Sequence, residues 1–321
     1  MSTNIETEVS NTEQRLRSLL TNAAQPQEGS LKSSIETIDY RDIRQVFHVK
    51  QPLGDDSPVT GAPLSFASPS EFRKAVRRNE FTSSTNGICP GRMQCNLIVL
   101  EEEYAFDFLL FCQKNPRACP LVEVCDVGAF TATVAEGSDL RTDIPKYCIY
   151  QNGKLLTKTH DATPYWPPKA VAFLIGCSFS YDGALLKAGI PLRSVEQKKN
   201  VPMYKTNVPC HPAGRFGGHV VVSMKPIKAV DVAKEVLITS KYALAHGAPL
   251  CVGCPESIGI QNLNNPDWGE SVDILPDEVP VFHYCGVTPQ QVLMESGVPF
   301  FISHSPGHML VTDLASDHAV V

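Results

Sequence analysis

The sequence predicts an α/β fold, and two features of its pattern support this. Short runs rich in β-branched and aromatic residues are typical of strands, and they occur at 95–100, 170–176, 219–226, 279–286 and 298–304. Two of these runs, "AVAFLIG" and "VPVFHYC", continue at once into a helical pattern, which is typical of α/β proteins. In such sheets, ligands bind at the carboxyl ends of strands, beside helix N-termini.

Three helices have recognisable ends. Ser68 is expected to cap a helix that begins with proline, and Glu71 completes a capping box. The apolar spacing of "EEYAFDFLLFCQKNP" predicts a second helix, which ends at the Asn-Pro pair. In "TPQQVLMESG", Thr288 is the expected cap and Gly297 the expected stop.

The chain is predicted to have three parts. Residues 1–35 are polar and are expected to form a leader outside the fold. Residues 36–140 and 235–321 are assigned to the main α/β domain. The stretch 141–234 is assigned to a smaller α+β subdomain inserted into it, because a hairpin pattern with Asn152-Gly153 as its turn interrupts the α/β order.

Composition limits the classes of function. A net charge of -6 over 321 residues argues against nucleic acid or an acidic membrane as a partner and favours a small molecule. No apolar run reaches the roughly 18 residues that span a bilayer, and the acidic N-terminus does not resemble a signal peptide. We therefore expect a cytoplasmic protein whose 11 cysteines are mostly free thiols. A homodimer is left open.

The stretch "IGCSFSYD" has the strongest local pattern for chemistry. Gly176 allows a sharp turn after a strand, and Cys177 and Ser178 then meet a helix N-terminus, where backbone N–H groups bind anions and depress a thiol pKa. Asp182 follows one turn later. These residues predict either a carboxylate cradle with a nucleophile or proton donor, or a tight joint with a buried structural cysteine.

Amides and histidines supply further candidates. Gln94 and Asn96 alternate with apolar residues on a strand, where they can bind a carboxylate or cap a turn. His304 and His308 flank a Ser-Pro-Gly turn, and His246 precedes another turn. Such histidines suit proton transfer or metal ligation, although they also satisfy loop carbonyls.

Cys251 and Cys254 form a C-x-x-C pair in the Gly/Pro-rich stretch "HGAPLCVGCPESIGI". A tetrahedral zinc site needs a second pair of ligands, and His283 with Cys285 in "FHYC" can supply it. A redox pair and a purely structural turn are the alternatives.

A series of short sequence motifs, taken in order, resembles the hydro-lyase family that also occurs fused in D-glutamate cyclase. The matching words include "PGRMQCNLIVL", "DLRTDIPKY", "FLIGCSFSYDGAL", "VPMYKTN", "HGAPLCVGCPESIGI", "EVPVFHYCGVTPQ" and "HSPGHMLVTDL", and they span about residues 70 to 315. The resemblance implies a three-layer α/β domain with a smaller two-layer domain, a lyase that eliminates water, and no established cofactor. The resemblance also implies that the fused cyclase carries a further domain, which we do not expect in this chain.

This chain departs from the family pattern at four positions. It has Cys251 and Cys254 where relatives have His and Asp, His283 where they have Trp, and Asp182 where they have Glu. These departures favour zinc or a different substrate, and they remove two groups that acid–base chemistry could use.

The leading hypothesis is a lyase that acts on a small amino or hydroxy carboxylic acid. Elimination of water needs a base, an acid and donors for the developing anion. His246 or His304 is the expected base and His308 or Asp182 the expected acid. Residues expected to bind the substrate are Gln94, Asn96, Arg141, Ser180, Arg215, Cys285, Gly286 and Thr288. The alternatives are thiol-dependent amide or lactam chemistry at Cys177 and a non-catalytic metabolite-binding or zinc-stabilised protein. All of these hypotheses require the turns near 89, 177, 246–254, 285 and 304–308 to converge on one cavity.

Overall fold

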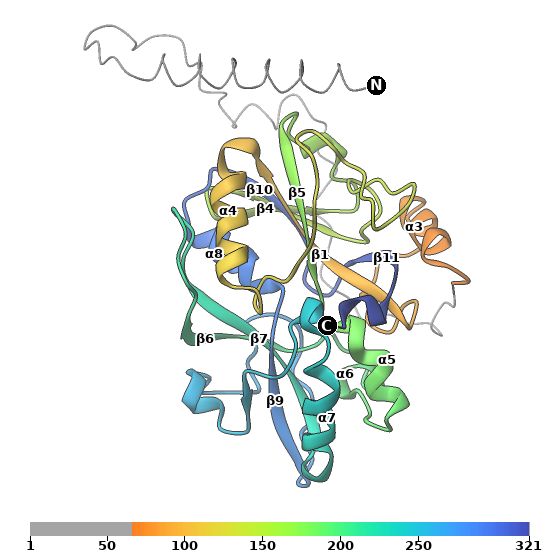
Figure 1. The fold of residues 1–321 in the computed structure, drawn as a ribbon, viewed down its shortest axis with the longest axis vertical. Coiled ribbons are helices and arrows are strands. Elements are labelled where there is room, and N and C mark those ends of the chain that lie inside the picture. The colour runs from red at the N-terminus through yellow and green to blue at the C-terminus, as the bar shows by residue number, and fades with distance from the viewer. Residues whose placement is uncertain (1–65, 321) are drawn as a thin grey trace, which may run out of the picture. The chain divides into compact units, whose positions relative to one another are not determined.

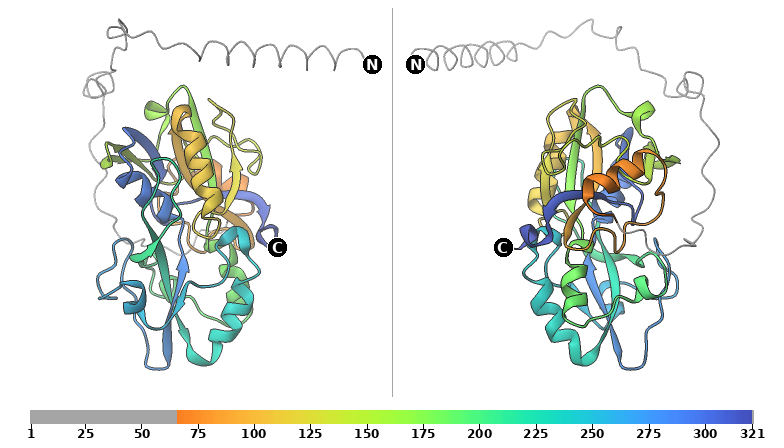
Figure 2. Two further views of the ribbon diagram at one scale, coloured as in Figure 1. Left: turned by 60° about the vertical axis from the view of Figure 1, so that its left-hand side comes forward. Right: turned by 90° about the vertical axis from the view of Figure 1, so that its right-hand side faces the viewer.

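The computed structural model describes residues 66–320, so the predicted leader 1–35 and residues 36–65 lie outside the described residues. The described chain is a mixed α/β structure with two sheets flanked by helices (Figures 1 and 2), which confirms the predicted class. Every pairing between its named strands is antiparallel. The three-layer architecture stays a prediction.

The larger sheet has seven strands. Their order is β2 (Leu121–Val124), β5 (Ala170–Gly176), β1 (Arg92–Glu101), β10 (Phe300–His304), β3 (Tyr147–Gln151) and β4 (Lys154–Thr159), and β11 (Leu310–Ala315) also pairs with β1. β10 and β11 pair with successive parts of the same edge of β1, since Ile98 lies opposite Ser303 and Gln94 opposite Val311. The loop between them, residues 305–309, therefore lies beside the middle of β1.

The smaller sheet has four strands in the order β6 (Met203–Pro209), β7 (His219–Lys228), β9 (Glu278–Tyr284) and β8 (Cys251–Val252). Membership of the two sheets crosses the predicted domain boundaries. β3, β4 and β5 fall within 141–234 but belong to the larger sheet, and β8 and β9 fall within 235–321 but belong to the smaller sheet, where β9 pairs with β7 and β8 pairs with β9.

Helices connect and cover these sheets. They are α3 (Pro69–Arg77), α4 (Glu102–Lys114), α5 (Phe179–Lys187), α6 (Arg193–Glu196), α7 (Val232–Thr239) and α8 (Val287–Glu295). Short 3-10 turns occur at η2 (Thr163–Tyr165), η3 (Ala229–Asp231), η4 (Ala243–Ala245), η5 (Pro255–Ile258) and η6 (Ser316–Ala319). No helix within 66–320 is long and apolar enough to cross a bilayer.

The predicted helix ends are mostly confirmed. The hydroxyl of Ser68 accepts a hydrogen bond from the backbone N–H of Glu71 and so caps α3. The predicted turn at Asn152-Gly153 joins β3 and β4, and both residues have positive φ, 49° and 73°. The cap assigned to Thr288 is wrong, because α8 begins one residue earlier and the Thr288 hydroxyl bonds to the backbone of β7 instead.

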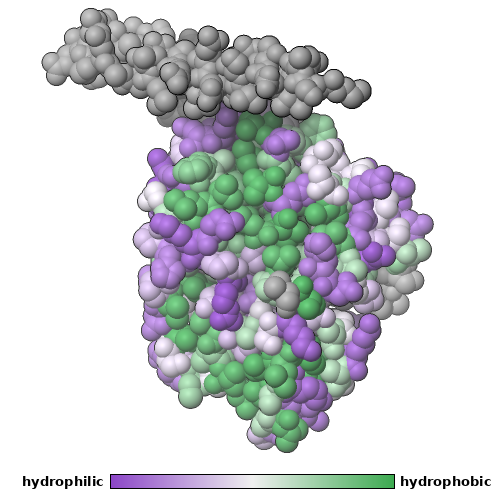
Figure 3. Space-filling view, viewed as in Figure 1, coloured by the Kyte–Doolittle hydropathy of each residue, from purple (hydrophilic) through white to green (hydrophobic). Residues whose placement is uncertain are grey.

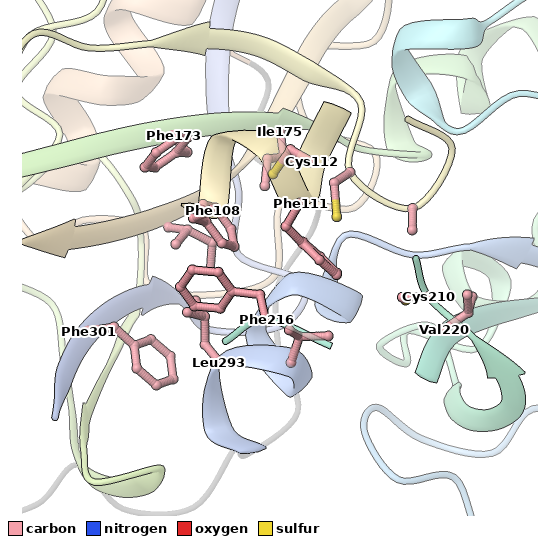
Figure 4. Packing of buried hydrophobic residues seen from close by; sticks show 14 of the residues in the cluster. Phe108, Phe111, Cys112, Phe173, Ile175, Cys210, Phe216, Val220, Leu293 and Phe301 are labelled. Atoms are coloured by element: carbon pink, nitrogen blue, oxygen red, sulfur yellow. The ribbon is translucent and has the colours of Figure 1, made fainter. Parts of the chain in front are cut away.

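One apolar cluster joins the two sheets. Phe108 of α4 packs edge-on against Phe173 of β5, with ring centroids 4.8 Å apart, and against Phe216, 5.4 Å away (Figure 4). Leu293 of α8 and Val220 of β7 belong to the same cluster. Because a close-packed interior resists rearrangement, this cluster fixes the larger sheet relative to the smaller one.

Some apolar side chains remain at the surface. Val230 and Leu237, beside and on α7, are 87% and 68% exposed, and the space-filling view shows hydrophobic side chains over this part of the molecule (Figure 3). Scattered exposed apolar residues are normal in a folded protein, so they do not by themselves indicate a binding surface.

The end of β5 lies directly against the turn that precedes His246. A Cβ atom added to Gly176 would lie 1.6 Å from the carbonyl oxygen of Leu244. Glycine is therefore required at position 176 because the backbone of Leu244 leaves no room for a side chain, and not because of an unusual backbone angle. This contact brings the start of α5 next to residues 243–246.

We expect Gly176→Ala to destabilise the protein by several kcal/mol, because the methyl group meets backbone that cannot move aside. Gly183→Ala, in α5, is the matched control: its Cβ would meet nothing closer than 3.6 Å, and alanine in a helix stabilises by roughly 0.5–1 kcal/mol. Urea denaturation midpoints measure both changes. Equal midpoints for the two variants would contradict the close approach.

Candidate active site

A buried polar cluster lies on the face of the smaller sheet that α5 and α7 cover. It consists of Tyr181, Asp182, Lys225, Glu235, His246 and His283, each less than a tenth exposed. Charged groups are rarely fully buried unless they are paired. The cluster is therefore the candidate active site of this fold.

Strand alternation sets the positions of the sheet residues in the cluster. Ser223 of β7 lies opposite His283 of β9, and directly opposed residues point to the same face. Lys225 is two residues further along β7 and shares that face. Tyr181 and Asp182 reach it from the first turn of α5, and Glu235 reaches it from α7.

Asp182 and Lys225 form a buried ion pair. Nζ of Lys225 lies 2.6 Å from Oδ1 of Asp182, and each side chain is 8% exposed. The same Nζ lies 4.3 Å from the centre of the Tyr181 ring, a geometry in which the aromatic face stabilises the cation. Burial raises the pKa of Tyr181 well above its ordinary value. The pair therefore places one cation and one carboxylate beside the start of α5.

His283 and Glu235 form a second buried pair. Nε2 of His283 lies 2.7 Å from Oε1 of Glu235, and both side chains are fully buried. The His283 ring lies 5.5 Å from the Tyr181 ring, so Tyr181 stands between the two pairs. The 2.7 Å approach lacks the geometry of a hydrogen bond, because both ring nitrogens of His283 and both carboxylate oxygens of Glu235 are buried without a hydrogen-bond partner among residues 66–320. The hydroxyl of Ser223 is also buried without one.

His246 and His304, the expected bases, are buried against backbone carbonyls. Nδ1 of His246 lies 2.8 Å from the carbonyl oxygen of Arg117. Nδ1 of His304 lies 3.3 Å from both the backbone N and the carbonyl O of Leu97. Burial lowers the pKa of each imidazole to about 4, so both are neutral at pH 7. His246 also has a φ of 78°, a conformation that costs energy for a residue with a side chain.

The thiols at the helix starts are not activated. Burial raises the pKa of Cys177 to about 12 and that of Cys285 to about 11. The sequence pattern had predicted the opposite, a thiol pKa depressed by the N-terminus of α5. Desolvation outweighs the helix N-terminus here, because Cys177 is only 7% exposed and packs against apolar side chains. This disfavours Cys177 as a nucleophile.

Part of the expected cavity is filled. Cys177, Phe179, Val221, Val287 and Met309 pack together, and Cys285 lies against them. The turns near 177, 285 and 305–309 do converge, as expected, but an apolar cluster occupies the space between their side chains. Val221 of this apolar cluster shares its face of β7 with Ser223 and Lys225, so the buried polar groups adjoin the filled space on the same face of the smaller sheet.

Several expected substrate-binding groups hold the backbone together. The Gln94 amide donates to the carbonyls of Thr85 and Ile88. The Ser180 hydroxyl accepts from the backbone N–H of Gln94. The Asn96 amide donates to two carbonyls of β5 and lies 2.0 Å from where a Cβ on Gly286 would be. These side chains position α5 and α8.

The two arginines expected to clamp a carboxylate have other partners. Arg141 makes a bidentate pair with Asp139, at 2.8 and 2.7 Å, and its guanidinium lies 3.6 Å from the centre of the Phe130 ring. Arg215 is exposed, over the ring of Tyr104. Lys225 is therefore the cation that the fold places in the cluster.

The four expected zinc ligands do not come together. Cys251 lies opposite Phe282 in the β8–β9 pair, so it faces away from His283, the next residue in β9. Cys254 is exposed in the following turn. Across residues 66–320, no three His, Cys, Asp or Glu side chains are placed to hold a metal ion.

His308, a candidate acid, has Nδ1 3.1 Å from the carbonyl oxygen of Pro306 in its own turn.

Ser178 precedes α5, is 5% exposed, and lies beside Tyr181. Of the catalytic candidates, the structure thus brings Asp182, His246, Cys177 and Ser178 near one another, and it places His304 and His308 on the β1 side.

Sequence reasoning missed Lys225, Glu235 and Tyr181. A lysine inside the apolar run "HVVVSMKP" was the available indication, since a buried strand lysine requires a partner.

Comparisons with known proteins agree on the family. The sequence model described as D-glutamate cyclase matches residues 171–313. A protein of Agrobacterium fabrum is 52% identical over 243 residues, covering 75% of this chain and 90% of its own length. One from Bacillus velezensis is 48% identical over 259 residues, covering 80% and 98%. Both carry provisional hydro-lyase names.

A nitrogen repressor-like protein of Methanococcus jannaschii, whose crystal structure is known, overlaps 73% of this chain and 90% of its own, with 10% identity and a TM-score of 0.32. That overlap is too loose to support an argument. The sequence relatives, by contrast, match at about half of all positions over most of both chains. This chain therefore belongs to the hydro-lyase family of enzymes, whose family description is D-glutamate cyclase.

Proposed function

We propose that this protein eliminates water from a small amino or hydroxy carboxylic acid, in the manner of a D-glutamate cyclase. The family supports this class of reaction. The buried Asp182–Lys225 pair is the observation that carries the proposal at the level of residues. The cytoplasmic location and the homodimer stay predictions from the sequence.

Cyclisation of glutamate requires definite proton movements. The amine, having lost a proton from its ammonium form, uses its nitrogen electron pair to form a bond to the carbon of the side-chain carboxyl group. That carbon becomes tetrahedral. Its C–OH bond then breaks as the hydroxyl accepts a proton and the nitrogen releases one, so that a five-membered lactam and water are formed. An acid, a base and a cation for the oxyanion are needed.

The cluster contains groups suited to these tasks. Lys225 supplies the cation, which neutralises the carboxylate that is attacked and stabilises the oxyanion. Asp182, 2.6 Å away, holds the Lys225 ammonium group in place and takes the proton that the substrate ammonium group loses before the attack. His246 is neutral at pH 7 and is available to hydrogen-bond to the ligand. A dehydration of a hydroxy acid would use the same groups in the same roles.

Burial makes these charges more effective. The side chains of Asp182 and Lys225 are both buried, and electrostatic interactions strengthen where water is excluded. A substrate reaches them only when the surrounding segments open. The ligand is then enclosed while the reaction occurs, which protects the intermediate from solvent.

We expect purified protein to convert D-glutamate into its lactam with loss of one water, measured by mass spectrometry. Lys225→Met should lower kcat by about 10²–10³-fold, because it removes an oxyanion-stabilising charge. Lys228→Met is the control, since this lysine is exposed at the end of the same strand; it should leave kcat unchanged.

Removing one member of a buried ion pair can unfold a protein, so Lys225→Met with Asp182→Asn provides a second variant without either charge. It should fold and be inactive. Wild-type activity in either folded variant would contradict the proposal, as would the absence of water loss from every amino and hydroxy acid in a panel of small substrates.

Stability should rise with pH between about 4 and 6.5. In that range the histidines of the unfolded chain bind protons, whereas His246 and His304 in the folded chain, with pKa values of about 4, do not. Each histidine contributes up to about 3 kcal/mol, present above pH 6.5 and lost as pH falls to 4. Urea midpoints across this range test it. His304→Gln should flatten the slope; an unchanged slope would contradict the assignment.

A further inference from the structure

We infer that His283, held by Glu235, is the histidine that exchanges protons with the substrate, and that Glu235 is its positioning residue. The inference rests on the proposed function and assigns a role to a residue that the sequence had suggested as a zinc ligand. Neither His246 nor His304, the expected bases, is given this role.

The partner of each ring separates these histidines. His246 and His304 direct Nδ1 at backbone atoms of Arg117 and Leu97. His283 instead has a carboxylate oxygen 2.7 Å from Nε2. A carboxylate on one ring nitrogen orients an imidazole and stabilises its protonated form, so that the other nitrogen can accept and return a proton.

The other charges of the cluster leave His283 as the partner that Glu235 needs. Lys225 and Asp182 compensate each other. Glu235 is fully buried, and a buried carboxylate without a counter-charge or a proton costs several kcal/mol. The charge partner closest to hand is His283, whose Nε2 lies 2.7 Å from Oε1 of Glu235. The carboxylate and the imidazole therefore form one unit inside the cluster.

The other ring nitrogen of His283, Nδ1, is the atom that would bond to a ligand. Nδ1 has no hydrogen-bond partner within residues 66–320, which is also true of Nε2 in His246 and His304. At His283 a second such atom, the Ser223 hydroxyl, lies at the opposed position of the neighbouring strand. Buried polar atoms are almost always hydrogen-bonded. Two such atoms at opposed positions of one sheet face indicate a place where a ligand forms hydrogen bonds.

This place adjoins the Asp182–Lys225 pair. The ring of Tyr181 is 5.5 Å from that of His283 and 4.3 Å from Nζ of Lys225. Lys225 is also two residues from Ser223 on the same face of β7. A small acid held by Lys225 therefore lies next to Nδ1 of His283, which takes the proton that the attacking amine releases and gives it to the departing hydroxyl.

The test is the conversion of D-glutamate by full-length His283→Ala, with and without added imidazole. We expect kcat to fall by about 10²–10⁴-fold with KM little changed, and imidazole to restore at least part of it by occupying the vacated space. Glu235→Gln should lower kcat by a similar factor with the ring still present. His219→Ala, an exposed histidine at the start of β7, is the control and should neither lose activity nor respond to imidazole.

Fold is checked by urea midpoint, and if His283→Ala does not fold, the neutral pair His283→Asn with Glu235→Gln replaces it. Wild-type kcat in a folded His283 variant overturns the inference and leaves the proposed function intact. Loss of activity without imidazole rescue, together with wild-type kcat in Glu235→Gln, also overturns it in favour of a structural role. No water loss by the unmodified protein on any acid of the panel defeats the proposed function and this assignment together.

Discussion

The candidate site depends on one buried side chain, Asn96. Its amide donates to the carbonyls of Ile175 and Gly176, 3.2 and 2.9 Å away, at the end of β5. The same amide fills the space that a side chain on Gly286 would need. Two strand–helix joints that are far apart in the sequence therefore meet at Asn96. Because α5 and α8 start at the same point, the residues of the first turn of α5 face the smaller sheet at a fixed position.

From that position, charge pairing determines the rest of the arrangement. Lys225 lies in a strand whose neighbours are fully buried, so it requires the carboxylate of Asp182. Glu235 faces the same sheet from α7 and requires His283. Leaving one member of such a pair unpartnered costs about 3–5 kcal/mol, whereas apolar residues of similar volume would often be as stable. Two polar pairs around Tyr181 are thus poorly explained by stability alone, and proton transfer gives a reason for them.

Local patterns predicted much of the fold. The runs at β1, β5, β7, β9 and β10 form strands, and the capped segment and the segment with apolar helical spacing form α3 and α4, because strand and helix periodicity depend on neighbouring residues. Pairing direction does not, so the antiparallel sheets could not be read from strand–helix joints. The same limit explains the site. Asn96 and Thr288 were expected to bind substrate, but each finds a backbone partner that only the folded chain brings near. Gln94 bonds to carbonyls of the loop just before its strand, as the alternative of capping a turn had suggested. Lys225 and Glu235 were missed because their partners lie far away in the sequence.

The departures that the family resemblance implies at positions 182, 251, 254 and 283 separate into two groups. Cys251 and Cys254 would replace a histidine and an aspartate, but Cys251 faces away from Lys225 and Cys254 is exposed. Their replacement leaves the buried polar cluster intact, so it does not remove the acid–base groups of this chain. Asp182 and His283, by contrast, lie within the cluster, on either side of Tyr181. An aspartate is shorter than the glutamate it replaces, and an imidazole carries protons that an indole cannot exchange. These two positions are therefore where this chain can differ in chemistry from its relatives.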